Sequence, residues 1–251
     1  MEKENENVAE FCVDSSVIMD MYYLHKNNKQ RIVSTLTRQR GSTDYVPKMY
    51  SLLKAEKIRL YVPYGVLGDL YYQQDEPYEE IQKFLEEHNF VNMSLVTFKN
   101  EELGRTSSLL SHRYCTPLPE GHIEFLQKRI NDKGVNLNLH RPAFEKNKLG
   151  KPNKYAKNMA ECATAGLPFV TVNDQVYIKC NRVDLIEYTN RGVKGVDRDA
   201  KPISPDYMFV LAENENKPKM SRKFKEALEA LGTDLRSFEF KTFQEEMGMD
   251  L

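Results

Sequence analysis

The sequence predicts an α/β fold: a Rossmann-like three-layer sandwich in which helices cover both faces of a mainly parallel sheet. Short apolar runs typical of buried strands alternate with segments whose apolar residues recur at helical spacing. Acidic residues lie at or just beyond the ends of two of the runs, where parallel sheets form ligand sites. With 251 residues, the chain can form one large domain with an added extension.

The first part of the chain predicts strands and helices in alternation. A strand over 10–13 leads into a helix over 15–24, with a serine at its cap. A helix over 45–56 precedes a second strand over 58–62, which ends at a proline. Further helices are predicted over 66–72 and 78–88, and a third strand over 93–97.

The second part predicts the end of the domain and an extension. A helix over 155–165 should end at Gly166, where a left-handed residue is favoured, and a buried strand over 167–171 should follow. The other expected elements are helices over 101–114 and 123–131, a mobile loop over 133–153 and a short strand that turns into a helix within 200–210. The expected division is a domain over 8–212 and an extension over 213–251, comprising a polar linker and a helix over 221–231.

Composition limits the classes of function. The 36 basic and 37 acidic side chains nearly balance, so nucleic-acid contact has to be local. The 4 cysteines form no CxxC pair, which argues against a zinc site and a disulfide framework and favours a reducing cytoplasm. No stretch approaches the roughly 20 apolar residues that span a bilayer, and the charged N-terminus is not a signal peptide. We therefore expect no contact with a membrane.

Three aspartates occupy positions that a parallel sheet could bring together. Asp14 follows the first strand, Asp69 lies in the helix after the second, and Asp174 lies just beyond the 167–171 strand. Taken singly, an aspartate after a strand is most often a helix cap or a turn residue. Together, carboxylates converging from remote segments are what a divalent metal ion needs for phosphodiester cleavage.

The residues around these acids resemble the PIN-domain nucleases. The segments 11–20 and 62–70 are similar to the family's first two motifs, although the second has Asp69 where the family usually has glutamate. The segment 163–174 resembles the helix end, glycine, strand, threonine and closing aspartate, and 202–209 resembles the final strand and turn. The resemblance spans about 11–210 and implies that Asp14, Asp69 and Asp174 bind Mg²⁺ or Mn²⁺.

One family acid is missing. The resemblance places Asn158 where the family has an aspartate in the helix before the last motif. Glu161 lies one turn further on the same helical face and could supply the carboxylate as a fourth catalytic residue. Alternatively, Glu161 is a solvated helix residue and the site has only three acids. Ser15, Ser16 and Thr171 are expected to position the carboxylates, and Asn158 to support them.

A run of lysines precedes this motif helix and could bind RNA phosphates at the rim of the site. The alternative is a solvated loop, which is the usual role of a charge run. The lysines are Lys146, Lys148, Lys151, Lys154 and Lys157.

These features predict a metal-dependent ribonuclease. Two alternatives remain: a degenerate member of the family that binds RNA or a protein without cutting, and the toxin of a toxin–antitoxin pair. A second copy of the chain or a regulatory protein is a further candidate partner. No phosphate-binding GxxxxGK[ST] or GxGxxG loop is present, which argues against nucleotide cofactors.

Overall fold

The computed structural model describes residues 8–28, 45–72, 75–114, 154–173, 202–232 and 234–239. In this part of the chain five parallel strands form one sheet in the order β3-β2-β1-β4-β5. The strands are β1 (Ala9–Val13), β2 (Ile58–Val62), β3 (Val91–Asn92), β4 (Phe169–Val170) and β5 (Pro202–Ile203). The predicted α/β class and parallel sheet are confirmed.

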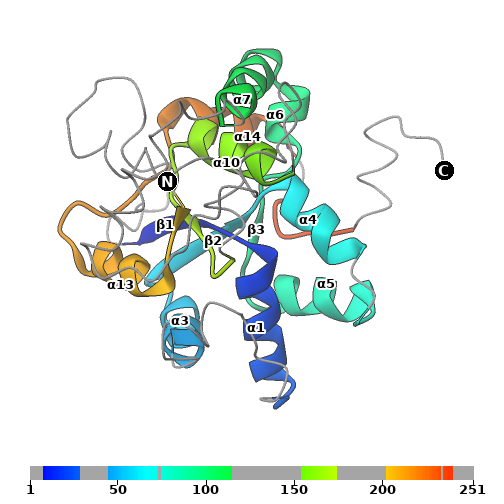
Figure 1. The fold of residues 1–251 in the computed structure, drawn as a ribbon, viewed down its shortest axis with the longest axis vertical. Helices are drawn as coiled ribbons and strands as arrows, with labels where there is room; N and C mark the ends of the chain where they lie inside the picture. The colour runs from blue at the N-terminus through cyan, green and yellow to red at the C-terminus, as the bar shows by residue number, and fades with distance from the viewer. Residues whose placement is uncertain are drawn as a thin grey trace, which may run out of the picture.

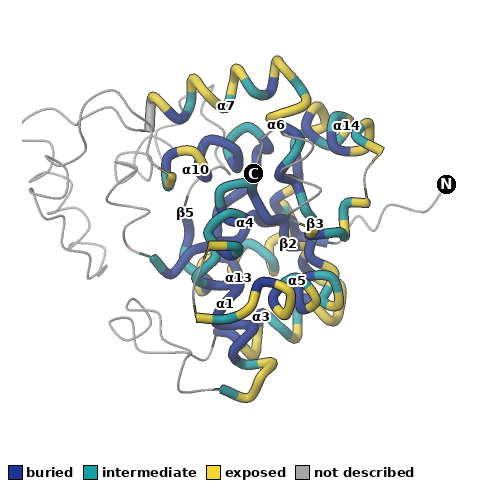
Figure 2. The backbone as a smooth tube through the Cα atoms, turned by 90° about the vertical axis from the view of Figure 1, so that its right-hand side faces the viewer, coloured by how far each residue is buried: buried dark blue, intermediate teal, exposed yellow. Residues whose placement is uncertain are grey.

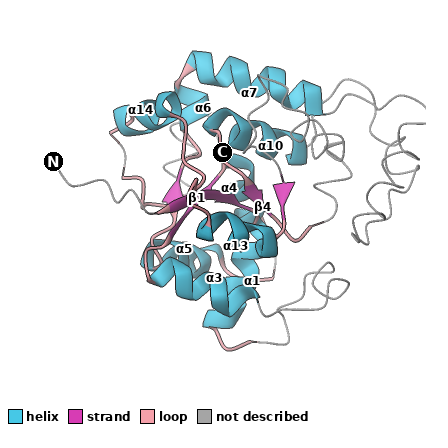
Figure 3. Cartoon of the chain, turned by 90° about the vertical axis from the view of Figure 1, so that its left-hand side faces the viewer, coloured by secondary structure: helices cyan, strands magenta, loops and turns pink. Residues whose placement is uncertain are grey.

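Helices cover both faces of the sheet (Figure 1). Helices α6, α7, α10 and α14 lie on one side, and α1, α3, α5 and α13 lie on the other (Figure 3). Helix α4 contacts both α1 and α10, so it joins the two layers. The helices are α1 (Ser15–His25), α3 (Tyr45–Lys54), α4 (Tyr64–Tyr71), α5 (Tyr78–Glu87), α6 (Val96–Lys99), α7 (Glu101–Tyr114), α10 (Lys154–Ala165), α13 (Pro205–Glu213) and α14 (Arg222–Ala230).

The order of the strands creates a switch point between β1 and β4. From β1 the chain adds β2 and then β3 on one side, and it later returns to the other side to add β4 and β5. Cys12 pairs with Phe169 and Val13 with Val170, so the carboxyl ends of β1 and β4 lie side by side. In open α/β sheets, ligands bind in the crevice formed at such a point.

The strands form the centre of the hydrophobic core because helices cover them on both faces. Phe11, Val13 and Phe169 are fully buried, as expected for strands of a doubly covered parallel sheet. Strands β1 and β4 are buried along their whole length, while most of the outer helix α7 is exposed or partly exposed (Figure 2). Burial of the apolar strands therefore fixes where their carboxyl ends lie, and Asp14 directly follows one of these ends.

The prediction of a strand over 93–97 is wrong. The third strand is β3, which ends at Asn92, and α6 begins at Val96. The Asn92 side chain accepts hydrogen bonds from the Ser94 backbone N–H (3.0 Å) and hydroxyl (2.6 Å), which turns the chain out of the sheet. The apolar run did not distinguish strand from helix, because periodicity is ambiguous over so few residues.

The segment that follows α13 is built into the same core. The linker and helix lie where the sequence predicts them, but the Pro218 carbonyl accepts a hydrogen bond from the Glu10 N–H (2.9 Å), beside β1. The buried Glu10 carboxylate also accepts a bond from the Met220 N–H (2.7 Å). Phe224 and Phe238 are fully buried. These residues therefore pack as part of the domain.

The helix end at Gly166 is confirmed, with a left-handed φ of 76°. Within the described ranges, no helix is both long enough and apolar enough to span a membrane. The predicted helix over 123–131 and loop over 133–153 lie outside the residues that the structure describes.

Candidate functional site

Asp14 lies at the switch point, immediately after β1, and is only 3% exposed. It occupies the N-cap position of α1, but its side chain makes no capping hydrogen bond. Instead its Oδ2 atom accepts hydrogen bonds from the hydroxyls of Ser16 (2.7 Å) and Thr171 (2.8 Å). The Asp14 carboxylate is therefore oriented by Thr171, which follows β4, and by Ser16 of its own helix. A capping aspartate would instead accept a hydrogen bond from the amide of the second or third helical residue.

Burial raises the pKa of Asp14 above its ordinary value, and the Ser16 and Thr171 hydroxyls only partly oppose that rise. The negative charge of Asp69 raises it further, while the backbone of Ser15 makes a smaller lowering contribution. An ionised carboxylate in such a place gains from a nearby cation. The electrostatics of the switch point thus favour binding of positive charge.

Asp69 lies on α4, with 25% of its side chain exposed, and forms an ion pair with Lys154 at the start of α10 (Nζ to Oδ1, 3.0 Å). Burial lowers the pKa of Lys154, but the Asp69 bond and the charges of Asp69 and Asp14 outweigh that effect, so the pKa is raised. The Lys154 ammonium therefore lies in the field of both aspartates. It is a basic group beside the acids, and it pairs with one of them.

Asn158 is 2% exposed and lies on the face of α10 that packs against α4. A Cβ atom added to Gly65, in the first turn of α4, would lie 1.9 Å from Asn158 Oδ1. Asn158 Oδ1 is buried without a hydrogen-bond partner among the described residues. The side chain at the expected acid position is thus a neutral amide that packs directly against the α4 backbone.

Glu161 is 4% exposed, which rules out the solvated helix residue of the alternative prediction. Its Oε2 atom accepts a hydrogen bond from the Tyr64 N–H (2.9 Å), the first amide of α4. In the described part of the chain, its other oxygen, Oε1, is buried and lacks a partner. Burial raises the pKa of Glu161 to about 8, and the Tyr64 bond only partly offsets this. Glu161 is therefore mostly protonated at neutral pH.

The remaining predicted site residues divide between described and undescribed parts of the chain. Lys157 is exposed on α10. The Thr171 Oγ1 atom that donates to Asp14 also accepts a bond from the Asn173 N–H (3.0 Å). The residues outside the described ranges are Asp174, Lys146, Lys148 and Lys151.

The described carboxylate oxygens are of the type that a divalent cation prefers, but they are too few to complete its coordination. Asp14 and Asp69 offer the hard carboxylate oxygens that Mg²⁺ and Mn²⁺ prefer, and they lie close enough for the charge of Asp69 to raise the pKa of Asp14. A cation bound between them would offset the repulsion between the two carboxylates. Among the residues whose placement is described, however, no three His, Cys, Asp or Glu side chains form a metal-binding group.

Two features of the site were missed from the sequence. The Tyr64 N–H is the partner of Glu161, and Gly65 provides the space that Asn158 fills. Gly65 precedes the predicted helix over 66–72, so the packing signal that a glycine inside a helical pattern gives points instead to Gly68, where an added Cβ would meet no neighbour that the structure describes. No comparable signal identifies a backbone amide as the partner of a glutamate 97 residues away.

Compared with protein-family models, with curated proteins and with solved structures, the chain gives no match.

Proposed function

We propose that this chain is a metal-dependent ribonuclease whose site lies at the carboxyl ends of β1 and β4. The observation that carries the proposal is the hydrogen bond from Thr171 to Asp14, which fixes a buried carboxylate at the topological switch point. Open α/β sheets bind ligands at this place. The resemblance of the flanking motifs to PIN-domain nucleases supports RNA as the substrate.

The proposed roles follow from the described contacts of Asp14, Asp69 and their neighbours, and for Asp174 from the resemblance alone. Asp14 and Asp69, with Asp174, would hold Mg²⁺ or Mn²⁺, which supplies a Lewis acid for phosphodiester hydrolysis when bound. Ser16 and Thr171 hold the Asp14 carboxylate in one orientation. Lys154 forms an ion pair with Asp69 and would contact a phosphate of the bound RNA.

The test is cleavage of single-stranded and structured RNAs by the purified protein with Mn²⁺, with Mg²⁺ and with EDTA. Asp14→Asn should abolish cleavage while leaving the thermal unfolding midpoint close to that of the wild type. Asp234→Asn is the matched control, because Asp234 is exposed and, among the described residues, its Oδ1 atom accepts only a local turn bond from the Arg236 N–H (2.9 Å). Cleavage that survives Asp14→Asn or EDTA would rule out the proposal.

A second candidate is a module that binds RNA or a protein without cleaving. It is favoured by Asn158, a neutral amide at the expected acid position, and by Lys154, which already balances the charge of Asp69. Titration with Mn²⁺ separates the two candidates, since a catalytic site should show saturable binding that Asp14→Asn removes. Absence of such binding together with retained RNA affinity would favour the second candidate.

A further inference from the structure

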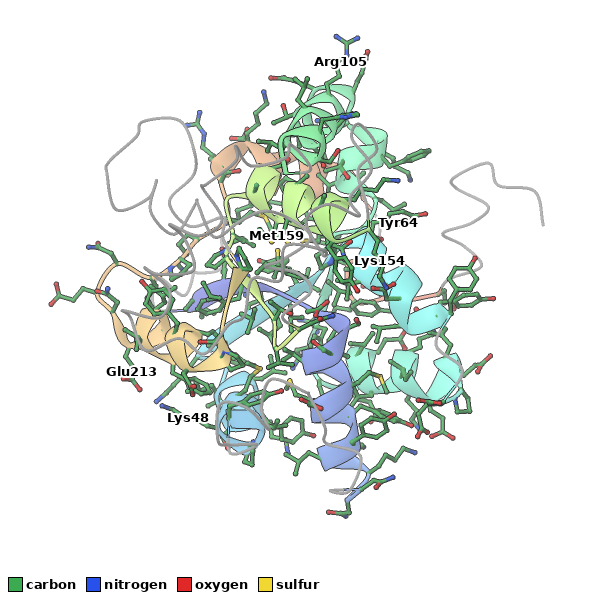
Figure 4. The ribbon with its side chains drawn as sticks, in the orientation of Figure 1. Lys48, Tyr64, Arg105, Lys154, Met159 and Glu213 are labelled. Carbon is green, nitrogen blue, oxygen red and sulfur yellow. The ribbon has the colours of Figure 1, made fainter. Side chains whose placement is uncertain are left out.

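Three side chains of α10 contact α4 along one helical stripe. Lys154, Asn158 and Glu161 are spaced by four and then three residues, so they share one face of the helix. Lys154 pairs with Asp69, Asn158 packs against Gly65, and Glu161 accepts the bond from Tyr64. The labelled Tyr64 and Lys154 lie where the two helices meet (Figure 4). Helix α10 therefore contacts α4 from Tyr64, the first residue of α4, to Asp69.

The Glu161 contact anchors the beginning of α4. The N-cap residue of α4 is Pro63, which makes no side-chain capping bond, so Glu161 provides the side-chain acceptor for the first amide of the helix. A helix held at its first turn and at Asp69 has little freedom to slide or rotate. The position of the Asp69 carboxylate relative to Asp14 thus depends on α10.

We infer that Glu161 is a positioning residue for the proposed site: by accepting the Tyr64 N–H, it fixes α4 and hence the place of Asp69. This inference rests on the proposed function and assigns Glu161 a role different from that of a catalytic carboxylate. The raised pKa of Glu161 agrees with it, because a mostly neutral carboxyl is a poor metal ligand but still accepts a hydrogen bond.

Two substitutions separate positioning from catalysis. Glu161→Gln keeps a neutral acceptor oxygen, so at pH 7 its kcat for Mn²⁺-dependent cleavage should stay within about twofold of the wild type. Glu161→Met keeps a similar shape without the acceptor, and its kcat should fall about tenfold or more with little change in KM, because small displacements of reacting groups are costly. A loss in Glu161→Gln as large as in Asp14→Asn would overturn the inference.

Hydrogen exchange provides a readout that does not depend on activity. The Tyr64 amide should exchange about tenfold or more faster in Glu161→Met than in the wild type, and at the wild-type rate in Glu161→Gln. Unchanged Tyr64 exchange in a folded Glu161→Met protein would overturn the inference even if cleavage fell. If the wild type cleaves no RNA, the proposed function fails, and the exchange rates alone decide whether Glu161 holds α4.

Discussion

Thr171 donates its hydroxyl hydrogen bond to Asp14 across 2.8 Å, joining residues that lie 157 positions apart in the sequence. The bond connects the ends of β1 and β4 at the switch point of the sheet. It also lowers the pKa of a carboxyl that burial raises, so it favours the ionised form of Asp14.

Removal of the Thr171 hydroxyl should therefore weaken the site with limited effect on the fold. Thr171→Val should reduce Mn²⁺ affinity or cleavage about 10- to 150-fold, since a hydrogen bond to a charged group contributes about 1.5–3 kcal/mol. Thr171→Ser should retain most of the activity. Thr164→Val is the control, because the bond that the Thr164 hydroxyl makes within the described part of the chain is a local one to the Ala160 carbonyl of α10 (2.7 Å). Equal losses at both threonines would contradict the assigned role.

The buried carboxyl of Glu161 predicts a dependence of stability on pH. Its pKa rises from 4.5 to about 8 on folding, so its contribution is fully present below pH 4.5 and is lost as the pH rises through about 8. Between about pH 5 and pH 9 the wild type should lose a few kcal/mol of unfolding free energy relative to Glu161→Gln. Denaturant unfolding of both proteins across this range checks the prediction, and parallel curves would refute it.

The two glycines of α4 should respond oppositely to alanine. In Gly65→Ala the new Cβ would meet Asn158 Oδ1 at 1.9 Å, so the variant should lose about 1–3 kcal/mol of stability. At Gly68 an added Cβ would have no described atom within 4 Å apart from the neighbouring backbone of its own helix, and Gly68→Ala should stabilise by up to about 1 kcal/mol. Adding Asn158→Ala to Gly65→Ala should recover stability. Thermal unfolding checks all three, and a Gly65→Ala protein as stable as Gly68→Ala would contradict the packing.

The segment after α13 should be essential for folding. Phe224→Ala should cost about 3–5 kcal/mol because Phe224 is fully buried. Phe98→Ala is the matched control and should cost less than about 1 kcal/mol, since Phe98 is 50% exposed. The comparison is made by chemical denaturation. A small, equal loss in both variants would show that α14 does not contribute to the core as described.

The sequence by itself determined most of the regular elements, because hydrophobic periodicity and end signals act over a few neighbouring residues. It located β1, β2 and α10 to within a residue or two, and it identified the left-handed helix end at Gly166. It also singled out Asp14 and Thr171, which the structure joins by a hydrogen bond, since acids and hydroxyls at strand ends are visible in the sequence. The run over 93–97 was misassigned because a short apolar segment lacks a distinguishing period.

Only the tertiary structure decided what these residues contact. The bond from Tyr64 to Glu161 and the approach of Asn158 to Gly65 depend on how α10 packs on α4. No local pattern encodes that packing, because it joins segments nearly a hundred residues apart. Burial then changed the chemistry expected of Glu161, since removal of a carboxyl from water raises its pKa and favours its neutral form.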